Sequence, residues 1–163
     1  MATLKDLKKR HLIALDRGLD LGRVDDILLH PSEHRVACLV VRAAEVPEIS
    51  IVCPASAVRS YAADQIAIPS VTSLSLGHEN ADLLELLRAN DHMRKRPVLS
   101  SEGKSLGRIR AIDVDNAGHV VMYYVGHGPF GLFGRREIPP EEVRALGGDV
   151  AVLKADGIEK PET

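Results

Sequence analysis

Histidine pairs are the first candidates for chemistry in this sequence. His30 and His34 are four positions apart, a spacing at which two imidazoles on a helix reach one metal ion. Pro31 lies between them, however, and it predicts a turn rather than a helix. His119 and His127 flank one predicted strand, and neither pair has a cysteine or a carboxylate cluster at ligand spacing. We therefore predict exposed turn histidines, with no metal site and no cofactor.

Two short motifs match ion-binding or phosphate-binding loops only in part. Residues 113–118 read Asp-Val-Asp-Asn-Ala-Gly, which begins like a calcium loop, but the fifth position is Ala117 and the twelfth is Tyr124 instead of glutamate. Residues 100–104 read Ser-Ser-Glu-Gly-Lys and lack the glycine spacing and the Gly-Lys-Ser/Thr order of a phosphate loop. Both motifs predict turns, and we assign no catalytic residue.

Segment 126–136 is the best candidate for binding a partner. Its four glycines and Pro129 predict a loop, and it carries two of the five aromatic residues of the chain. The candidate partner-binding residues are Phe130, Leu132, Phe133, Arg135 and Arg136. Apolar and basic side chains in one exposed loop suit a protein interface. The alternative is that the apolar side chains cap a barrel or pack between two barrels.

A stretch that occurs twice determines how these candidates are positioned. Residues 18–27 and 103–112 share the pattern Gly-x-x-Leu-Gly-Arg-(Val/Ile)-x-x-Ile at a separation of 85 positions. The same separation relates Pro54 to Pro139. The glycines predict a tight turn, and the apolar alternation after them predicts a strand that the turn feeds. We therefore predict an internal repeat.

Each copy contains several short apolar stretches between turn-forming residues, a pattern typical of a small sandwich or barrel. Between the copies, Asn80 predicts the N-cap of a helix with an apolar face of Leu83, Leu84 and Leu87. The predicted fold class is mainly β: two small β-barrels in tandem with a short linking α-helix. The predicted boundaries are residues 1–76 for the first barrel, 77–95 for the linking helix, 96–157 for the second barrel and 158–163 for a disordered tail.

Composition limits the classes of partner. The chain has 163 residues, a formal net charge of -2 and a pI near 6.4, so no global basic field attracts nucleic acid. An aromatic content of 3% leaves few side chains on which bases stack. Cys38 and Cys53 lie in apolar stretches and are expected to be buried, and residues 1–11 are expected to form a loose end or one helical turn. We find no signal peptide or membrane helix and expect a cytoplasmic protein with no integral membrane segment.

The repeated turn motif resembles the opening of the PRC-barrel family. In the second copy the resemblance continues through residues 112–115, 120–125, 130–136 and 138–143, whereas residues 46–51 replace the Phe-Gly-Leu-Phe-Gly-Arg-Arg loop in the first copy. The resemblance implies a small β-barrel that binds and assembles macromolecular complexes, and it implies no shared catalytic residue. The family also includes the C-terminal half of a ribosome maturation factor.

The resemblance and the candidate loop predict a non-enzymatic adaptor that mediates protein–protein binding or macromolecular complex assembly. The alternative is an RNA- or ribosome-associated maturation factor, suggested by the basic runs at residues 8–10 and 94–96. A weaker alternative is a metal-dependent hydrolase that uses the histidines. The expected partner is a protein, a homo-oligomer is compatible with the sequence, and RNA is less favoured because the net charge is near neutral.

Overall fold

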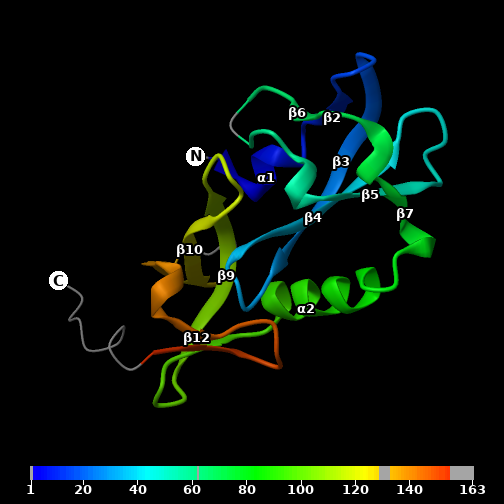
Figure 1. Cartoon of the computed structure of the whole chain (residues 1–163). Helices are drawn as coiled ribbons and strands as arrows, with labels where there is room; N and C mark the ends of the chain where they lie inside the picture. Colours follow the sequence, from blue (N-terminus) through cyan, green and yellow to red (C-terminus); the bar gives the residue numbers. More distant parts are fainter. Residues whose placement is uncertain (1, 62, 129–132, 155–163) are drawn as a thin grey trace.

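The protein is mainly β, with 47% strand and 20% helix, and one of its two sheets curls into a half-barrel (Figure 1). This computed structural model describes residues 2–61, 63–128 and 133–154, and of Phe133 it describes only the backbone. The mainly β fold class predicted from the sequence is therefore confirmed. The tail predicted at residues 158–163 lies outside the described residues.

The first sheet contains the first repeat, residues 11–68, and one strand that follows it. Its order is β6-β2-β3-β4-β5-β7. The strands are β2 (His11–Ala14), β3 (Leu19–His30), β4 (Arg35–Ala43), β5 (Ser50–Pro54), β6 (Ile66–Ile68) and β7 (Ser75–Leu76). Neighbouring strands run antiparallel, except that β6 runs parallel to β2.

The second sheet contains the second repeat, residues 96–153, in the order β11-β10-β9-β8-β13-β12, with β1 paired to β9. The strands are β1 (Ala2–Thr3), β8 (Val98–Leu99), β9 (Ser105–Val114), β10 (Val120–His127), β11 (Phe133–Ile138), β12 (Val143–Ala145) and β13 (Ala151–Leu153). Strand β13 runs parallel to β8, as β6 does to β2. Five strands of each repeat thus share order and direction, β6-β2-β3-β4-β5 in the first and β13-β8-β9-β10-β11 in the second.

Short helical turns follow the same repeat. The 3-10 helices Ala55–Ala57 and Pro140–Glu142 are 85 positions apart, and the second confirms the helical turn predicted there. Two more, Val71–Ser73 and Gly77–Glu79, lie in the connection between the repeats. The connection ends in the longer helix α2 (Leu83–Lys95).

The second glycine of each repeated motif lies inside a strand, so the predicted placement in a turn is wrong. Gly22 in β3 and Gly107 in β9 have φ angles of 129° and 110°. A Cβ atom added to Gly22 would meet the carbonyl oxygen of Arg42, and one added to Gly107 would meet that of Gly126. These glycines therefore allow the next strand to approach the backbone closely.

The two repeats share one hydrophobic core. Side chains from both repeats form one apolar cluster, which includes Leu12, Val24 and Leu39 of the first and Ile109 and Tyr123 of the second. Burial of apolar side chains from two sequence repeats in one cluster couples their stabilities.

The N-terminal residues take part in this fold, so the helical turn expected there as one alternative is confirmed and the loose end is wrong. Ala2 and Thr3 pair with Val114 and Asp113 of β9. Helix α1 (Leu4–Leu7) follows, and Leu7 is fully buried in the shared core. The start of the chain thus adds a strand to the second sheet.

Helix α2 covers the outer face of the first sheet, the face directed away from the shared core (Figure 1). Leu83 and Leu86 pack against an apolar cluster of Leu28, Cys38, Val40 and Val52. Within the described ranges, no helix is long and apolar enough to cross a membrane.

Two predicted details of α2 are wrong. The helix begins at Leu83, after Asp82, and the Asn80 side chain accepts a hydrogen bond from the Asp82 N–H at 3.2 Å instead of capping the helix directly. The predicted apolar face is rotated, because Leu84 is 66% exposed and Leu87 is 38% exposed. Adjacent leucines offer two overlapping stripes, and the inward stripe is the one that continues to the buried residues Asn90 and Met93.

Candidate protein-binding face

Residues predicted to form a partner-binding loop lie partly on a strand. Phe130 and Leu132 lie outside the described residues, and the backbone of Phe133 pairs with His127 of β10. Arg135 and Arg136 are within β11, so their prediction as loop residues is wrong. Two adjacent charged residues after several glycines do not show the apolar alternation from which a strand is predicted. They adopt extended backbone because they pair with β10.

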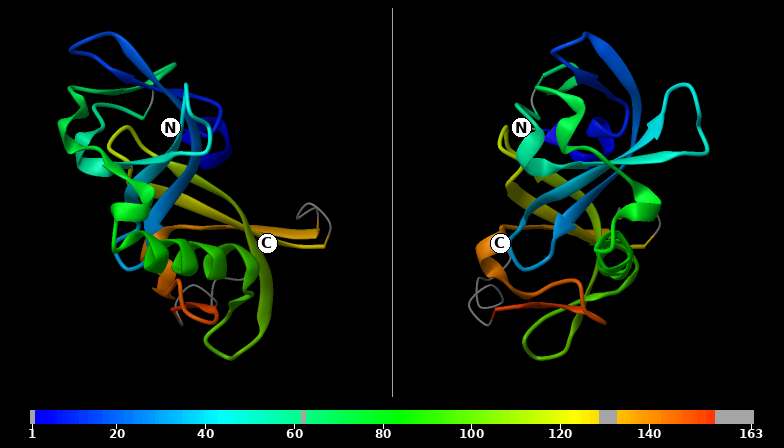
Figure 2. Two further views of the ribbon diagram at one scale, coloured as in Figure 1. Left: turned by 90° about the vertical axis from the view of Figure 1, so that its right-hand side faces the viewer. Right: turned by 45° about the vertical axis from the view of Figure 1, so that its right-hand side comes forward.

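Strands β10 and β11 form a hairpin that projects from the body of the molecule (Figure 2, left). Val125 and Tyr123 direct their side chains into the core, while Met122 and Tyr124 lie on the opposite face. We call this opposite face, with Asp113, Met122, Tyr124, Arg135 and Glu137, the second outer face.

Three side chains of the second outer face form one connected group. The Arg135 guanidinium carbon lies 4.6 Å from the centre of the Tyr124 ring, a cation–π contact. The Tyr124 hydroxyl donates a hydrogen bond of 2.7 Å to Oδ2 of Asp113. This hydrogen bond raises the pKa of Tyr124, so its hydroxyl stays protonated as a donor. The other carboxylate oxygen of Asp113 is buried and has no hydrogen-bond partner among the described residues.

Comparison of the repeats shows why this face is unusual. The apolar residues that α2 covers in the first repeat, Leu28, Cys38, Val40 and Val52, correspond by strand pairing to Asp113, Met122, Tyr124 and Glu137 in the second. The second set is more polar: Asp113 is buried, Met122 and Tyr124 are half-buried, and Glu137 is exposed. Divergence at the same structural positions therefore leaves Tyr124 and Glu137 more exposed than their equivalents Val40 and Val52.

The edge at β5 in the first sheet and the equivalent edge at β11 in the second also differ in what pairs with them. In the first repeat, β7 pairs antiparallel with the edge of β5, with Leu76 opposite Ile51 and Ser75 opposite Val52. In the second repeat, β11 is the last strand of its sheet among the residues described.

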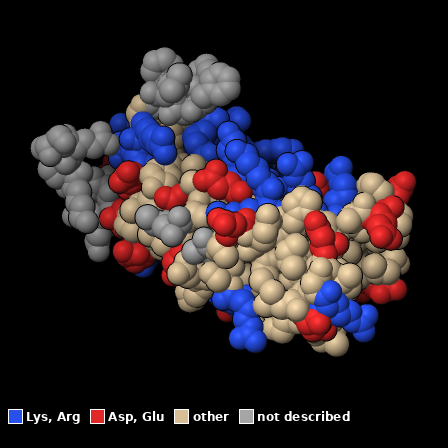
Figure 3. Space-filling view, turned by 90° about the horizontal axis from the view of Figure 1, so that it is seen from above, with Lys and Arg blue, Asp and Glu red and all other residues tan. Residues whose placement is uncertain are grey.

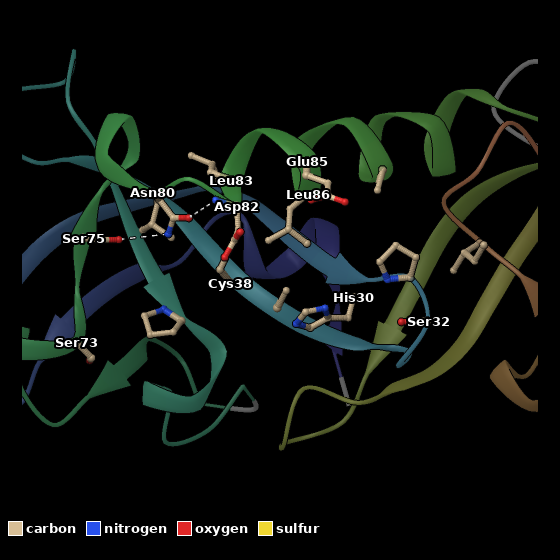
Figure 4. Close-up of a pocket in the computed structure, with 16 residues that line it drawn as sticks. His30, Ser32, Cys38, Ser73, Ser75, Asn80, Asp82, Leu83, Glu85 and Leu86 are labelled. Carbon is tan, nitrogen blue, oxygen red and sulfur yellow. Dashed lines mark hydrogen bonds between the residues drawn. The ribbon is translucent and has the colours of Figure 1, made fainter.

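The largest cavity that we describe lies between α2 and β4 (Figure 4), with a volume of about 690 Å³. Asn80 donates to the Ser75 hydroxyl at 3.4 Å, and Leu83 and Leu86 of α2 line the same cavity. Burial raises the pKa of the Cys38 thiol to about 11, so this cysteine is not a thiolate at neutral pH. Nδ1 of His30, also in the lining, lies 3.8 Å from a carboxylate oxygen of Glu33. This arrangement offers no activated cysteine.

A second cavity, of about 290 Å³, lies where α1, α2, β3 and β9 meet. Its rim carries basic side chains from the two basic runs noted in the sequence, Lys8 and Arg94, together with Lys5 and Arg110. Asp26 partly neutralises this rim, because it pairs with Lys8 at 3.3 Å and with Arg94 at 3.1 Å. Figure 3 shows that Lys and Arg gather along one side of the face it presents, with acidic side chains nearby.

The four histidines of the two pairs occupy turns or strand ends, as predicted, but His30 and His34 are half-buried instead of exposed, and His34 is structural. The ring nitrogen Nδ1 of His34 lies 2.7 Å from the Tyr123 hydroxyl of the other repeat. Burial lowers the pKa of His34, the charge of Lys154 lowers it further, and Glu141 opposes them. In the described residues, His, Cys, Asp and Glu side chains do not gather in groups of three or more that could hold a metal ion.

Asn90 has a structural role that the sequence analysis did not predict. It is 2% exposed, and its side chain accepts from the Leu29 N–H at 2.9 Å and donates to the Leu29 carbonyl at 3.0 Å. It also donates to the carbonyl of Leu86 at 2.8 Å. These hydrogen bonds fix α2 against β3. The sequence offers one sign of this role, a polar residue among the apolar residues of the inward stripe of α2.

Comparisons with known proteins add no relative to this description. No protein-family model matches the chain, and no curated protein matches it. The functional argument accordingly depends on the geometry of the second outer face.

Proposed function

We propose that this protein is a non-enzymatic adaptor that binds a protein partner through the second outer face. In this proposal the two repeats are PRC-barrel-like domains and α2 is the helix that links them, as the repeated turn motif suggests. The partner occupies on the second repeat the position that α2 occupies on the first.

The observation that carries the proposal is the contrast between equivalent faces. Leu83 and Leu86 cover Val40 in the first repeat, whereas its equivalent Tyr124 stays partly exposed on the second outer face. The solvated face of an antiparallel sheet is commonly polar. Beside its acidic residues Asp113 and Glu137, the second outer face presents a tyrosine, a methionine and an arginine, which are types enriched at protein interfaces.

Pre-organisation supports the same proposal. Tyr124 is held by Asp113 on one side and by Arg135 on the other, so its ring is already placed before a partner binds. A side chain that is fixed in advance loses less conformational entropy on binding. Tyr124 is therefore the residue that we expect to contribute most to affinity.

RNA binding is the second candidate, and the basic rim of the 290 Å³ cavity is the observation that favours it. Phosphate contacts would give affinity that falls steeply with salt. The net charge of -2 and the pairing of Asp26 with Lys8 and Arg94 weigh against this candidate. Filter binding of total RNA at two salt concentrations distinguishes it from protein binding.

The proposal is tested by affinity capture from native extract with three baits, quantified by mass spectrometry. The baits are the wild type, a Met122→Ser/Tyr124→Ser variant of the second outer face, and a Leu84→Ser control on the exposed side of α2. We expect proteins that the wild type and the control retain and that the face variant loses by roughly tenfold, a usual effect of losing an aromatic interface residue. Equal retention by all three folded baits would exclude this face as the binding site.

A further inference from the structure

The 290 Å³ cavity, which we call the junction cavity, has an apolar interior. Its walls include apolar side chains of α1, β3, α2 and β9, namely Leu4, Ile27, Met93, Ile109 and Ile112. Leu4 is half-buried, and the other four belong to the shared core. Asn90 also lines the cavity, but its side chain is already bonded to the backbone of Leu29 and Leu86. The interior therefore suits a hydrocarbon group rather than a polar one.

The rim of the junction cavity carries an excess of positive charge. Lys5, Lys8, Arg94 and Arg110 line it, and Asp26 is the one carboxylate among the lining residues that the structure describes. Asp26 pairs with Lys8 and Arg94, so these three side chains together keep one positive charge. With Lys5 and Arg110 added, the excess is three positive charges. A rim of this kind attracts an anionic group.

Two of these basic side chains can donate hydrogen bonds to an anion. Lys5 is exposed, and its ammonium group has no hydrogen bond or ion pair with the residues that the structure describes. Arg110 donates from Nε to the carbonyl of Gly126 at 3.4 Å and from Nη2 to that of Gly128 at 2.8 Å. These carbonyls hold the guanidinium in place without neutralising it, and Nη1 keeps its own donors. Charge-assisted hydrogen bonds to a carboxylate are among the stronger ones in proteins.

From this geometry we infer that the junction cavity binds a medium-chain carboxylate. The hydrocarbon chain lies against the apolar walls, and the carboxylate lies at the rim, where Lys5 and Arg110 donate hydrogen bonds to it. A group the size of a water molecule occupies about 30 Å³ of liquid, so a volume of about 290 Å³ holds a chain of about ten such groups. This inference is independent of the proposed function, because no residue of the second outer face lines the cavity.

The test uses the full chain and isothermal titration calorimetry with hexanoate, decanoate and decyltrimethylammonium, each below its micelle concentration. Decanoate should bind roughly hundredfold tighter than hexanoate, because each further methylene group that is buried contributes about fourfold. Decyltrimethylammonium has the same chain with the opposite charge, and it should bind at least roughly tenfold more weakly than decanoate. Equal affinity for the two chain lengths, or for the two head groups, would overturn the inference.

Variants of the cavity place the binding site. Lys5→Glu/Arg110→Glu should weaken decanoate binding by roughly tenfold or more, since it reverses both donors. The matched control Lys9→Glu/Arg108→Glu makes the same change of net charge at exposed residues of the same two segments that do not line the cavity, and it should bind decanoate like the wild type. Equal loss in both double variants would show a general charge effect and overturn the site.

A third variant, Ala111→Phe, tests the hydrocarbon part of the site separately. Ala111 is a half-buried residue of the lining, so a larger side chain narrows the cavity. The folded variant, checked by circular dichroism, should lose most of the preference for decanoate over hexanoate. An unchanged preference would overturn the assignment of the chain to this cavity.

Two other ligands could use the same basic rim, and both are included in the test. The wild type and the Lys5→Glu/Arg110→Glu variant are sedimented with vesicles of phosphatidylcholine and phosphatidylglycerol, and both are filtered with total RNA. If decanoate does not bind, and vesicles or RNA bind the wild type but not this variant, the rim belongs to a membrane surface or to RNA and the inference is wrong. Decanoate binding that the variant loses, without binding of vesicles or RNA, supports the inference.

Discussion

Arg35 and His119 form an antiparallel bridge between the turns of the two long hairpins. On either side of the bridge, Val36 N–H donates to the Gly118 carbonyl and Val120 N–H donates to the His34 carbonyl, both at 2.8 Å. The two hydrogen bonds run in opposite directions between the hairpins, as in antiparallel strand pairing. The two sheets are thus joined by backbone hydrogen bonds as well as by their shared core.

Alanine at Gly22 or Gly107 should destabilise the protein by more than about 3 kcal/mol, because the new Cβ meets a carbonyl of the neighbouring strand at a positive φ. Gly18 and Gly103 provide matched controls, since they also have positive φ but nothing within 4 Å of an added Cβ. Alanine there should cost about 1 to 2 kcal/mol. The measurement is urea unfolding followed by circular dichroism, and equal costs at both pairs would show that close strand approach is not the reason for the second glycine.

Asn90→Ala should destabilise the protein by about 2 to 4 kcal/mol, because it leaves buried backbone groups of Leu29 without their hydrogen bonds. Asp91→Ala on the same helix removes only the exposed ion pair with Lys95, 3.1 Å in length, and should cost less than about 0.5 kcal/mol. Chemical unfolding of both variants gives the comparison. Similar stability of the two variants would mean that Asn90 does not fix α2 against β3.

Stability should decrease as pH falls below about 6.5, the ordinary pKa of histidine. The pKa of His34 is lowered in the folded protein, so the unfolded chain binds a proton more readily and protonation favours unfolding. His34→Asn removes this titration and tolerates the left-handed backbone at this position, where φ is 51°. The free energy of unfolding at pH 7.5 and pH 5.5 should differ less for the variant than for the wild type. An identical pH dependence would exclude His34 as the titrating group.

Both cysteines should resist alkylation in the folded protein. Burial raises the pKa of Cys38 to about 11 and that of Cys53 to about 12, so neither is a thiolate at pH 8. Native protein should react with iodoacetamide much more slowly than protein unfolded in urea, as followed by mass spectrometry. The raised pKa values also predict that stability declines as pH rises from about 9 toward 11, because the unfolded thiols ionise first. Fast labelling of either thiol in the folded protein would contradict this account.

Local patterns were sufficient to predict the parts of the fold that depend on neighbours in sequence. The separation of 85 positions identified the repeat, and Asp115 to Gly118 form the predicted hairpin turn, with Gly118 N–H donating to the Asp115 carbonyl at 3.1 Å. Both cysteines are buried, as apolar surroundings predicted. These features need only turn chemistry and alternation, both of which are visible in a short window.

Contacts between distant residues could not be predicted in this way. The inward stripe of α2 depends on which leucines meet the cluster around Val40, and the sequence offers two overlapping stripes. The bond between His34 and Tyr123 joins residues 89 positions apart, so it depends on the arrangement of the two hairpins. The glycine-rich neighbours of Arg135 predict a loop, whereas pairing with β10, which is not visible in the local sequence, places it in a strand.

Photocrosslinking in cells tests the central claim most directly. Met122 on the second outer face is replaced by a benzophenone amino acid, and Leu84, on the exposed side of α2, is replaced as the control. The account predicts a protein adduct from position 122 that disappears in a Tyr124→Ser/Arg135→Glu background and is absent from position 84. Adducts of equal yield from both positions, or adducts at 122 that persist in that background, would contradict it.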